Sequence, residues 1–314
     1  MQQYVLKRLL LVVPTLLLVS VIVFSLTRLI PGDVVTLMFE EKGYAKDMDA
    51  LRARLGLDRP LPVQYVTWLG RIVQGDLGES LWTRRPVLEE ITRRLPVSLE
   101  LGLMAIGFAL CLALPIGILS ATRQDTLKDY TARSLAILGL SIPSFWKATL
   151  IIVLPSIWFG WAPPLQFTPL SHDPWQHFSQ FLAPAIILGI ASGASIMRLT
   201  RALMLEVLRQ DYVRTAWSKG LGEPRVVLKH ALKNAVIPVI TIVGIQIGQI
   251  AGGTVIMETI FGLPGMGRFL VDAIYQRDYP VVQGVNLLIA SIIVGANLLV
   301  DVTYAYLDPR IRYQ

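Results

Sequence analysis

The stretch that decides the fold is Asp211-Tyr-Val-Arg-Thr-Ala-Trp-Ser-Lys-Gly220, in the middle of a charged segment between two apolar ones. Between residues 201 and 233 this segment carries seven Lys or Arg residues against three acidic residues. Elsewhere, chain of this length between apolar runs is poor in charge or balanced. A basic segment between apolar runs is typical of the cytoplasmic loops of membrane proteins, so we interpret it as a cytoplasmic loop.

The composition indicates that water is not the main solvent of this chain. Hydrophobic residues make up 54% of the sequence and charged residues 16%, whereas roughly a quarter of the residues of soluble domains are charged. The apolar residues gather into runs that match the ~20 residues a helix needs to cross a bilayer. These runs are 9–27, 101–122, 135–161, 181–197, 234–257 and 279–300. A soluble helical core is disfavoured, because its helices would show polar stripes at a 3.6-residue period.

We therefore expect an all-α integral membrane protein with six transmembrane helices and a small helical extracytoplasmic domain after the first. The first helix covers residues 1–30, and the extracytoplasmic segment covers 31–95. The core covers 96–307, with helices near 97–122, 133–161, 181–200, 235–257 and 280–306 and a cytoplasmic loop over 201–234. Residues 308–314 form a cytoplasmic tail.

The net charge of +7 follows membrane topology and does not indicate a nucleic-acid partner. Lys7 and Arg8 precede the first apolar run, and Arg310 and Arg312 follow the last one, whereas residues 160–180 contain no Lys or Arg. Basic residues stay preferentially on the cytoplasmic side. Both termini are therefore expected in the cytoplasm, with residues 160–180 outside.

The segment after the first helix has the pattern of a small helical cap. Residues 47–56 and 62–74 are predicted to be short helices, and a third begins at Pro86 with Glu89 and Glu90 in its first turn. Gly75-Asp-Leu-Gly-Glu-Ser80 is predicted to be a turn between helices. It does not match a phosphate loop, because no Lys-Ser/Thr follows the glycines and no strand precedes them.

Glycines recur within the apolar runs, among them Gly107, Gly117, Gly189 and Gly193. Small residues let helices approach closely in lipid, so these positions suit a packed bundle. Pro143, Pro155 and Pro184 lie within the apolar runs and are compatible with kinks or with plain packing.

Lys147 is the one formal charge well inside an otherwise apolar run. An ionisable side chain at membrane depth is a functional hypothesis by default, so Lys147 is a candidate residue of the translocation path. The alternative is a helix that begins later, near Trp146, from which the ammonium group would reach the interface or pair with a neighbouring chain.

No pattern of catalytic or metal-binding residues stands out. His172, His177 and His230 are the only histidines, and the single cysteine, Cys111, lies in an apolar run. No metal-ligand spacing, catalytic cluster or nucleotide-binding loop accompanies them. We expect no catalytic residue, no metal and no cofactor bound by this chain.

The charged segment is predicted to form a helical hairpin. Leu208, Tyr212 and Ala216 share a helical face, Gly220-Leu-Gly-Glu-Pro224 breaks the helix, and Pro224 can begin a second helix that runs to residue 235. A protruding amphipathic hairpin suits docking in a groove of another protein. The alternative is a solvated or lipid-surface loop that is charged because it faces the cytoplasm.

The same stretch, with His230-Ala-Leu-Lys-Asn-Ala235 and Pro238, closely resembles the cytoplasmic EAA loop of ABC importer permeases in its peptide-transporter form. Further motifs look like the B-type permease of that family and cover essentially the whole chain. They are Ile30-Pro-Gly-Asp33, Leu55-Gly-Leu-Asp-Arg-Pro-Leu61, Gly75-Asp-Leu-Gly-Glu-Ser80, Glu258-Thr-Ile-Phe-Gly-Leu-Pro-Gly-Met-Gly-Arg268, Arg277-Asp-Tyr-Pro-Val-Val-Gln283 and Asp308-Pro-Arg-Ile-Arg-Tyr313.

The resemblance implies the type I ABC importer permease fold, in a subunit of a bacterial inner membrane transporter that works by alternating access. In this family the permease pairs with a second, similar permease, and two ATPases dock on the EAA loops. An external binding protein delivers di- or oligopeptides, glutathione or chelated nickel. ATP and Mg would be held by the ATPase chains.

The resemblance also implies site residues. Arg214, Thr215 and Ala216 occupy the Glu-Ala-Ala place, where the Glu is absent, and Gly220 is the turn glycine. The residues expected to couple to the ATPases are Asp211, Tyr212, Arg214, Thr215, Ala216, Lys219, Gly220, Pro224, His230 and Asn234. By topology, the loop that contains Gly262, Pro264, Gly265, Gly267 and Arg268 is expected outside, where it could contact the binding protein or dip towards the translocation path.

Two other classes of protein are weighed against this one. A self-contained secondary transporter would show an internal repeat and intramembrane ion-binding residues, and beyond Lys147 neither is evident. A membrane enzyme would need a catalytic cluster. Copurification of ATPase chains would separate an importer subunit from both.

Overall fold

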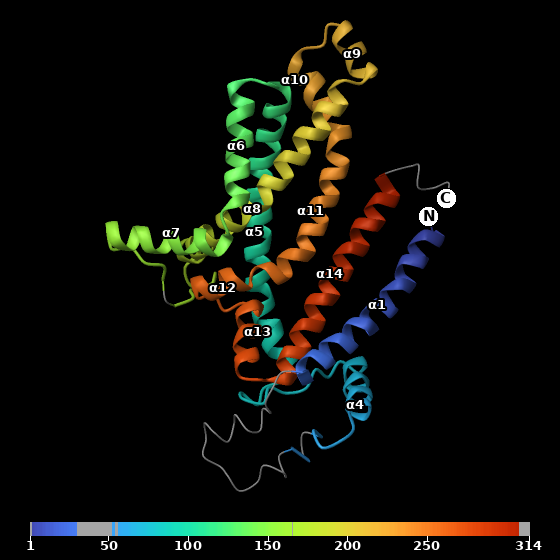
Figure 1. The fold of residues 1–314 in the computed structure, drawn as a ribbon, viewed down its shortest axis with the longest axis vertical. Coiled ribbons are helices and arrows are strands. Elements are labelled where there is room, and N and C mark those ends of the chain that lie inside the picture. The colour runs from blue at the N-terminus through green and yellow to red at the C-terminus, as the bar shows by residue number, and fades with distance from the viewer. Residues whose placement is uncertain (1, 30–51, 54–55, 165, 308–314) are drawn as a thin grey trace. The chain divides into compact units, whose positions relative to one another are not determined.

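The computed structural model describes residues 2–29, 52–53, 56–164 and 166–307, and its regular structure is helical (Figure 1). In chain order the helices are α1 (Gln2–Leu29), α4 (Leu61–Val73), α5 (Val87–Thr122), α6 (Leu127–Ser141), α7 (Ser144–Phe159), α8 (Pro174–Leu208), α9 (Asp211–Ser218), α10 (Glu223–Arg225), the π-helix η1 (Val226–Leu232), α11 (Lys233–Gly253), α12 (Val255–Phe261), α13 (Met266–Tyr275) and α14 (Tyr279–Leu307). The expected all-α class is confirmed. The expected helix over 47–56 falls largely outside the described residues, and so does the tail over 308–314.

Four of the described helices are long and apolar enough to cross a membrane. They are Leu6–Leu29, Val87–Thr122, Pro174–Leu208 and Tyr279–Thr303. Two helix pairs meet the same test together but are bent, Leu127–Ser141 with Ser144–Phe159 by 92° and Glu223–Val236 with Pro238–Gly248 by 50°. If each bent pair is one span, the described residues hold up to 6 spans.

The single helix expected over 133–161 is two helices in the structure. Figure 1 shows α7 turned away from α6 at the break between Ser141 and Ser144. Pro143 explains the break, because a proline ring disfavours the α conformation of the residue before it. Ile142 is accordingly extended, with φ −87° and ψ 122°.

The helix boundary expected near residues 95–97 is absent. α5 runs unbroken for 36 residues from Val87 to Thr122, so the helix expected to begin at Pro86 and the second span are one element. Pro96 lies inside α5 without ending it. By contrast, α4 agrees with the short helix predicted over 62–74.

The chain divides into two compact units, each made of segments distant in sequence. The first contains Leu99–Leu263 and the end of the chain from Ala296, and the second contains Gln2–Ser98 and Pro264–Gly295. The helices α5 and α14 each contribute residues to both units.

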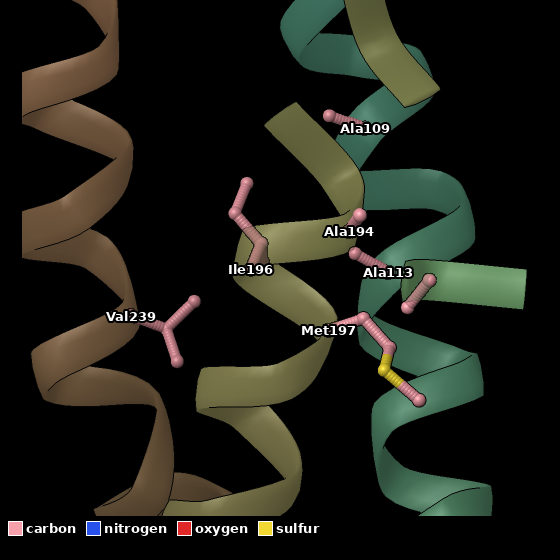
Figure 2. Packing of buried hydrophobic residues seen from close by; sticks show 7 residues of the cluster. Ala109, Ala113, Ala194, Ile196, Met197 and Val239 are labelled. Atoms are coloured by element: carbon pink, nitrogen blue, oxygen red, sulfur yellow. The ribbon is translucent and has the colours of Figure 1, made fainter. Parts of the chain in front are cut away.

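In the first unit, α5, α8 and α11 pack through small and medium side chains. Figure 2 shows Ala109 and Ala113 of α5 beside Ala194 and Met197 of α8, with Val239 of α11 near the opposite side of α8. Burial of such residues holds the helices in register, since close packing supplies the attraction between helices in lipid.

The glycines of α5 and α8 set how closely these helices approach. A Cβ at Gly189 would lie 2.9 Å from the Ala105 carbonyl oxygen, and one at Gly117 would lie 2.9 Å from the Met197 carbonyl oxygen. At Gly107 a Cβ would meet no atom within 4 Å. The close approach predicted for small residues is therefore found at Gly117 and Gly189, and Gly107 takes no part in it.

His177 joins two helices at the other end of the first unit. It is buried near the start of α8, and its Nδ1 donates a hydrogen bond to the Thr168 carbonyl at 2.8 Å. Its Nε2 lies 3.0 Å from both carboxylate oxygens of Glu100 on α5. This histidine therefore fixes the loop before α8 to the side of α5.

In the second unit, Asp278 joins two segments that the sequence analysis singled out separately. Its carboxylate accepts hydrogen bonds from the Ser80 hydroxyl at 2.6 Å and from the Leu81 N–H at 3.2 Å. The turn over residues 75–80 is thereby held against the start of α14. Gly78, with φ +81°, supplies the left-handed backbone of that turn.

Candidate functional site

The candidate site is the helical hairpin of residues 201–234, which we call the coupling hairpin. Its first limb is the end of α8, and Gln210, with an extended backbone at φ −74° and ψ 149°, redirects the chain into α9. Figure 1 shows α9 near the end of the hairpin, beyond the ends of α8 and α11 in this unit. The sequence therefore predicted where this element lies in the chain.

The buried face of α9 differs from the one expected. Val213 and Ala216 are buried and pack with Val226 of η1. Tyr212, expected on the same face, is 43% exposed. The reason is that the second limb of the hairpin approaches α9 from the side of Val213, a tertiary contact that the helical period alone does not contain.

The turn of the hairpin is at Gly220. This residue has φ +78°, a left-handed conformation that favours glycine, and its N–H donates to the Trp217 carbonyl at 2.9 Å. Pro224 follows at the start of α10, where its missing N–H costs no helical hydrogen bond. The expected order of helix, glycine turn and helix is present.

The second limb is not a regular α-helix. α10 spans only Glu223–Arg225, the π-helix Val226–Leu232 follows directly, and α11 begins at Lys233. The wider π-helical turn places Val226, Val227 and Ala231 in the buried side of the hairpin. Such π segments are rare and occur often at functional positions.

Three of the predicted coupling residues meet in the folded chain. The Asn234 amide donates to the Tyr212 hydroxyl at 2.7 Å, and that hydroxyl donates to the His230 carbonyl at 3.4 Å. Tyr212 thus joins α9 to the junction of η1 and α11. This network and the contact of Val213 with Val226 fix α9 to the second limb.

Most of the remaining predicted residues form the outer surface of the coupling hairpin. Side chains of Asp211 and Arg214 are 97% and 72% exposed and form an ion pair at 3.5 Å, which contributes little at such exposure. Thr215, Lys219 and Gly220 are also exposed, whereas Ala216 is buried. The structure therefore divides the predicted set into an outward surface and an inward anchor.

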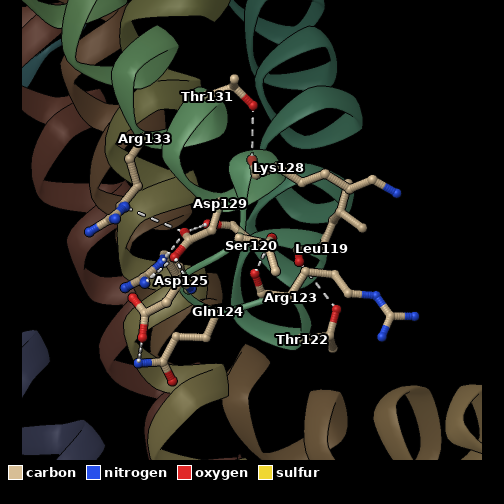
Figure 3. Close-up of polar contacts among 12 residues, drawn as sticks. Leu119, Ser120, Thr122, Arg123, Gln124, Asp125, Lys128, Asp129, Thr131 and Arg133 are labelled. Carbon is tan, nitrogen blue, oxygen red and sulfur yellow. Dashed lines mark hydrogen bonds and ion pairs between the residues drawn. The ribbon is translucent and has the colours of Figure 1, made fainter.

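A buried ionic cluster lies under the first limb, and sequence reasoning missed it (Figure 3). Asp129, in the first turn of α6, is fully buried and is bound through both carboxylate oxygens by Arg201 of α8, at 2.8 and 2.7 Å. Ser120 of α5 and the N–H of Asp125 donate to the same carboxylate. An acidic residue in a first turn is ordinary in helices, so the sequence carried no signal that set Asp129 apart.

Lys147 lies in the first turn of α7. Its Nζ donates to the carbonyl oxygen of Gly139, in the last turn of α6, at 2.9 Å. The ammonium group thus bridges the break at Pro143, which is close to the alternative of a helix beginning near Trp146. A role of Lys147 in the translocation path stays a prediction.

The predicted outer loop is largely inaccessible in this chain. Gly265 and Gly267 are buried, Gly262 and Pro264 are intermediate, and Arg268 alone of the five is exposed. Gly262 has φ +69° and ends α12. Among the described residues, no group of His, Cys, Asp or Glu could hold a metal ion.

Comparisons with known proteins agree with this arrangement. Residues 113–313 match the family model "Binding-protein-dependent transport system inner membrane component". Residues 1–102 match the model "Binding-prot-dependent transport system membrane comp, N-term". Together the two models cover nearly the whole chain.

The relatives include named transport proteins. The dipeptide transport system permease protein DppB of Escherichia coli K12 is 41% identical over 338 residues, covering 100% of both chains. The di/tripeptide transport system permease protein DppB of Pseudomonas aeruginosa UCBPP-PA14 is 42% identical over 335 residues, again with 100% coverage of both.

Solved structures share the fold at low sequence identity. An inward-facing MetNI methionine ABC transporter matches with a TM-score of 0.56 at 16% identity, over 70% of this chain and 97% of that one. An amino acid ABC transporter crystallised with histidines matches with a TM-score of 0.52 at 16% identity, over 71% and 94% of the two chains. The chain therefore belongs to the family of binding-protein-dependent transport system inner membrane components and is a membrane-spanning permease subunit of an ABC importer.

Proposed function

We propose that this permease moves di- or tripeptides, or a related small solute, into the cytoplasm by alternating access. The names of the full-length relatives at 41% and 42% identity support the peptide class. The proposed assembly contains a second, similar permease, two ATPases and an extracytoplasmic binding protein. ATP and Mg would be bound on the ATPase chains, and this chain would carry out no chemistry. Both termini would lie in the cytoplasm of a bacterial cell.

The observation that carries this proposal is the construction of the coupling hairpin. α9 is short, exposed on its outer side and anchored through Val213 and Ala216. A helix fixed in this way moves as a body with the limbs that hold it, so a force on α9 from a docked ATPase would displace α8 and α11. Closure of the ATPase pair on ATP would thus be converted into movement of membrane helices.

Gly220 offers a test of docking that separates charge from folding. A Cβ at Gly220 would meet no atom within 4 Å, and Asp and Asn are the side chains that best tolerate positive φ. We therefore expect Gly220→Asp to fold in the membrane but to lose substrate-stimulated ATPase activity and peptide uptake, because a carboxylate would enter the docking surface. The measurement is dialanine uptake and ATPase activity of the reconstituted complex.

Gly220→Asn is the matched control, since it has the same shape without the charge. It should retain more uptake than the Asp variant. Normal stimulated ATPase activity in Gly220→Asp would contradict docking at this turn. Failure of the wild-type chain to bring ATPase chains and a second permease with it on purification would contradict the proposed assembly.

Arg268 is the exposed residue among the five candidate contacts for the binding protein. It is exposed on α13 and lies 4.0 Å from Asp272, a separation at which an exposed ion pair holds weakly. Weaker stimulation of ATPase activity by the binding protein in Arg268→Ala would support this contact.

A further inference from the structure

We infer that the Asp129–Arg201 ion pair is the joint through which movement of the coupling hairpin reaches α5 and α6. This inference rests on the proposed function and deepens it, because it names positioning residues for coupling that touch neither the ATPase nor the solute. The pair lies in the first unit, close to the first limb of the hairpin.

The position of Arg201 ties it mechanically to the hairpin. It lies on α8, which ends at Leu208 and passes through Arg209 and Gln210 directly into α9. The seven residues of α8 that follow Arg201 make about two helical turns, or about 10 Å of continuous helix. A displacement of α9 along or across this axis therefore moves the Arg201 guanidinium with it.

The position of Asp129 ties the same joint to two further helices. Its carboxylate receives hydrogen bonds from Ser120, at the end of α5, and from the N–H of Asp125, in the turn between α5 and α6, at 3.0 Å for the latter. Arg133, one turn further along α6, lies 3.4 Å away. One buried side chain thus gathers α5, the turn, α6 and α8 at a single point (Figure 3).

The pair is built to transmit force in a fixed direction. Arg201 binds Asp129 with two parallel N–H···O contacts, a fork geometry that resists rotation as well as separation. The Asp129 side chain is 0% exposed and that of Arg201 17%, so water screens the contact only weakly. Neither group can turn to solvent without leaving the other charge buried.

Two exposed contacts join the same turn to the hairpin and serve as a comparison. Arg123 lies 3.4 Å from Glu223 of α10, with side chains 51% and 42% exposed. Arg209 lies 3.4 Å from the amide oxygen of Gln124. These contacts link the same turn to the hairpin, but because exposed pairs are weak they do not transmit force.

The test uses the complete complex in proteoliposomes, with the cognate binding protein loaded with dialanine. Uptake per ATP hydrolysed is measured for wild type, Asp129→Asn, Arg201→Lys and the exposed-pair control Arg123→Gln. In Asp129→Asn and Arg201→Lys this ratio should fall about tenfold, a typical coupling effect. In Arg123→Gln it should stay within about twofold of wild type.

The ratio separates coupling from stability, because less folded protein lowers uptake and hydrolysis together. Co-purified ATPase confirms assembly of each variant. An assembled Asp129→Asn complex with the wild-type ratio overturns the inference. If Asp129→Asn does not assemble, Arg201→Lys, which keeps the charge but loses the fork, decides in the same way. Failure of both to assemble also overturns it, by assigning the pair to folding.

The two proposals fail differently. A wild-type complex that takes up no dialanine contradicts the peptide assignment. If the wild-type complex takes up dialanine and the Asp129→Asn complex has the same uptake per ATP hydrolysed, the joint is contradicted and the peptide assignment is not affected.

Discussion

At the scale of single residues, Asp278 has a buried, ionisable carboxyl group that lies outside the membrane-spanning segments. Burial raises the pKa of its carboxyl above the ordinary value of 3.8, against the opposing effect of the hydrogen bonds from Ser80 and Leu81. The folded chain then holds the proton more tightly than the unfolded chain. Stability from this group is complete below the unfolded pKa and is lost as pH rises through the folded pKa.

Asp278→Asn should remove this pH dependence. The Tm of wild type relative to that of Asp278→Asn should therefore be higher at about pH 4 than at about pH 7. Fluorescence-detected unfolding in detergent measures both Tm values. Asp272→Asn, which changes an exposed carboxylate on α13, is the control and should keep the wild-type profile. A Tm difference that is constant across pH would contradict the prediction.

At the scale of elements, α5 and α8 depend on glycine at their contact. Gly189→Ala would place a Cβ 2.9 Å from the Ala105 carbonyl oxygen and 3.0 Å from the Cβ of Phe108. Because a backbone atom cannot yield as a side chain does, we expect a loss of about 1–3 kcal/mol in the free energy of unfolding, as for other overpacked sites. Denaturation of the purified chain in detergent measures it.

Gly107→Ala is the matched control on the partner helix, where a Cβ meets no atom within 4 Å. It should be neutral or stabilising, by about 0.5–1 kcal/mol, because alanine favours a helix over glycine. Equal stability of the two alanine variants would show that α5 and α8 separate freely at this point.

Elements were predictable where a long apolar run has no competing signal. The spans that became α1, α5, α8 and α14 follow from length and hydropathy. The break between α6 and α7 did not, because prolines are also tolerated inside membrane helices, and Pro96 within α5 is one such case. At Pro143 the break is accompanied by the Lys147 contact with Gly139, which the apolar pattern does not contain.

The coupling hairpin shows the same limit. Its place in the chain and its turn at Gly220 follow from charge and from glycine chemistry. The choice of Val213 over Tyr212 for the buried face does not, since it depends on where η1 packs. The role of Asp129 could not be predicted for a related reason. Its partner Arg201 is 72 residues away, and neither residue is unusual in its own helix.

At the scale of the whole molecule, the distribution of charge predicts the orientation in the membrane. Residues 201–233 hold seven basic residues, whereas 160–180 hold none. The cost of moving basic loops across a bilayer predicts that the first segment lies in the cytoplasm and the second outside. Each segment has an exposed serine that can be replaced by cysteine, Ser218 in the hairpin and Ser171 in the connection before α8.

Single cysteines at these two positions test the orientation. Cys111 is the only native cysteine, so Cys111→Ser supplies a clean background. In cells whose outer membrane has been removed and whose inner membrane is intact, a membrane-impermeant maleimide should label Ser171→Cys at once. It should label Ser218→Cys only after the inner membrane is permeabilised. Labelling of Ser218→Cys from outside would invert the topology and remove the coupling hairpin from the reach of any cytoplasmic ATPase. The same measurement therefore tests both the orientation and the proposed mechanism.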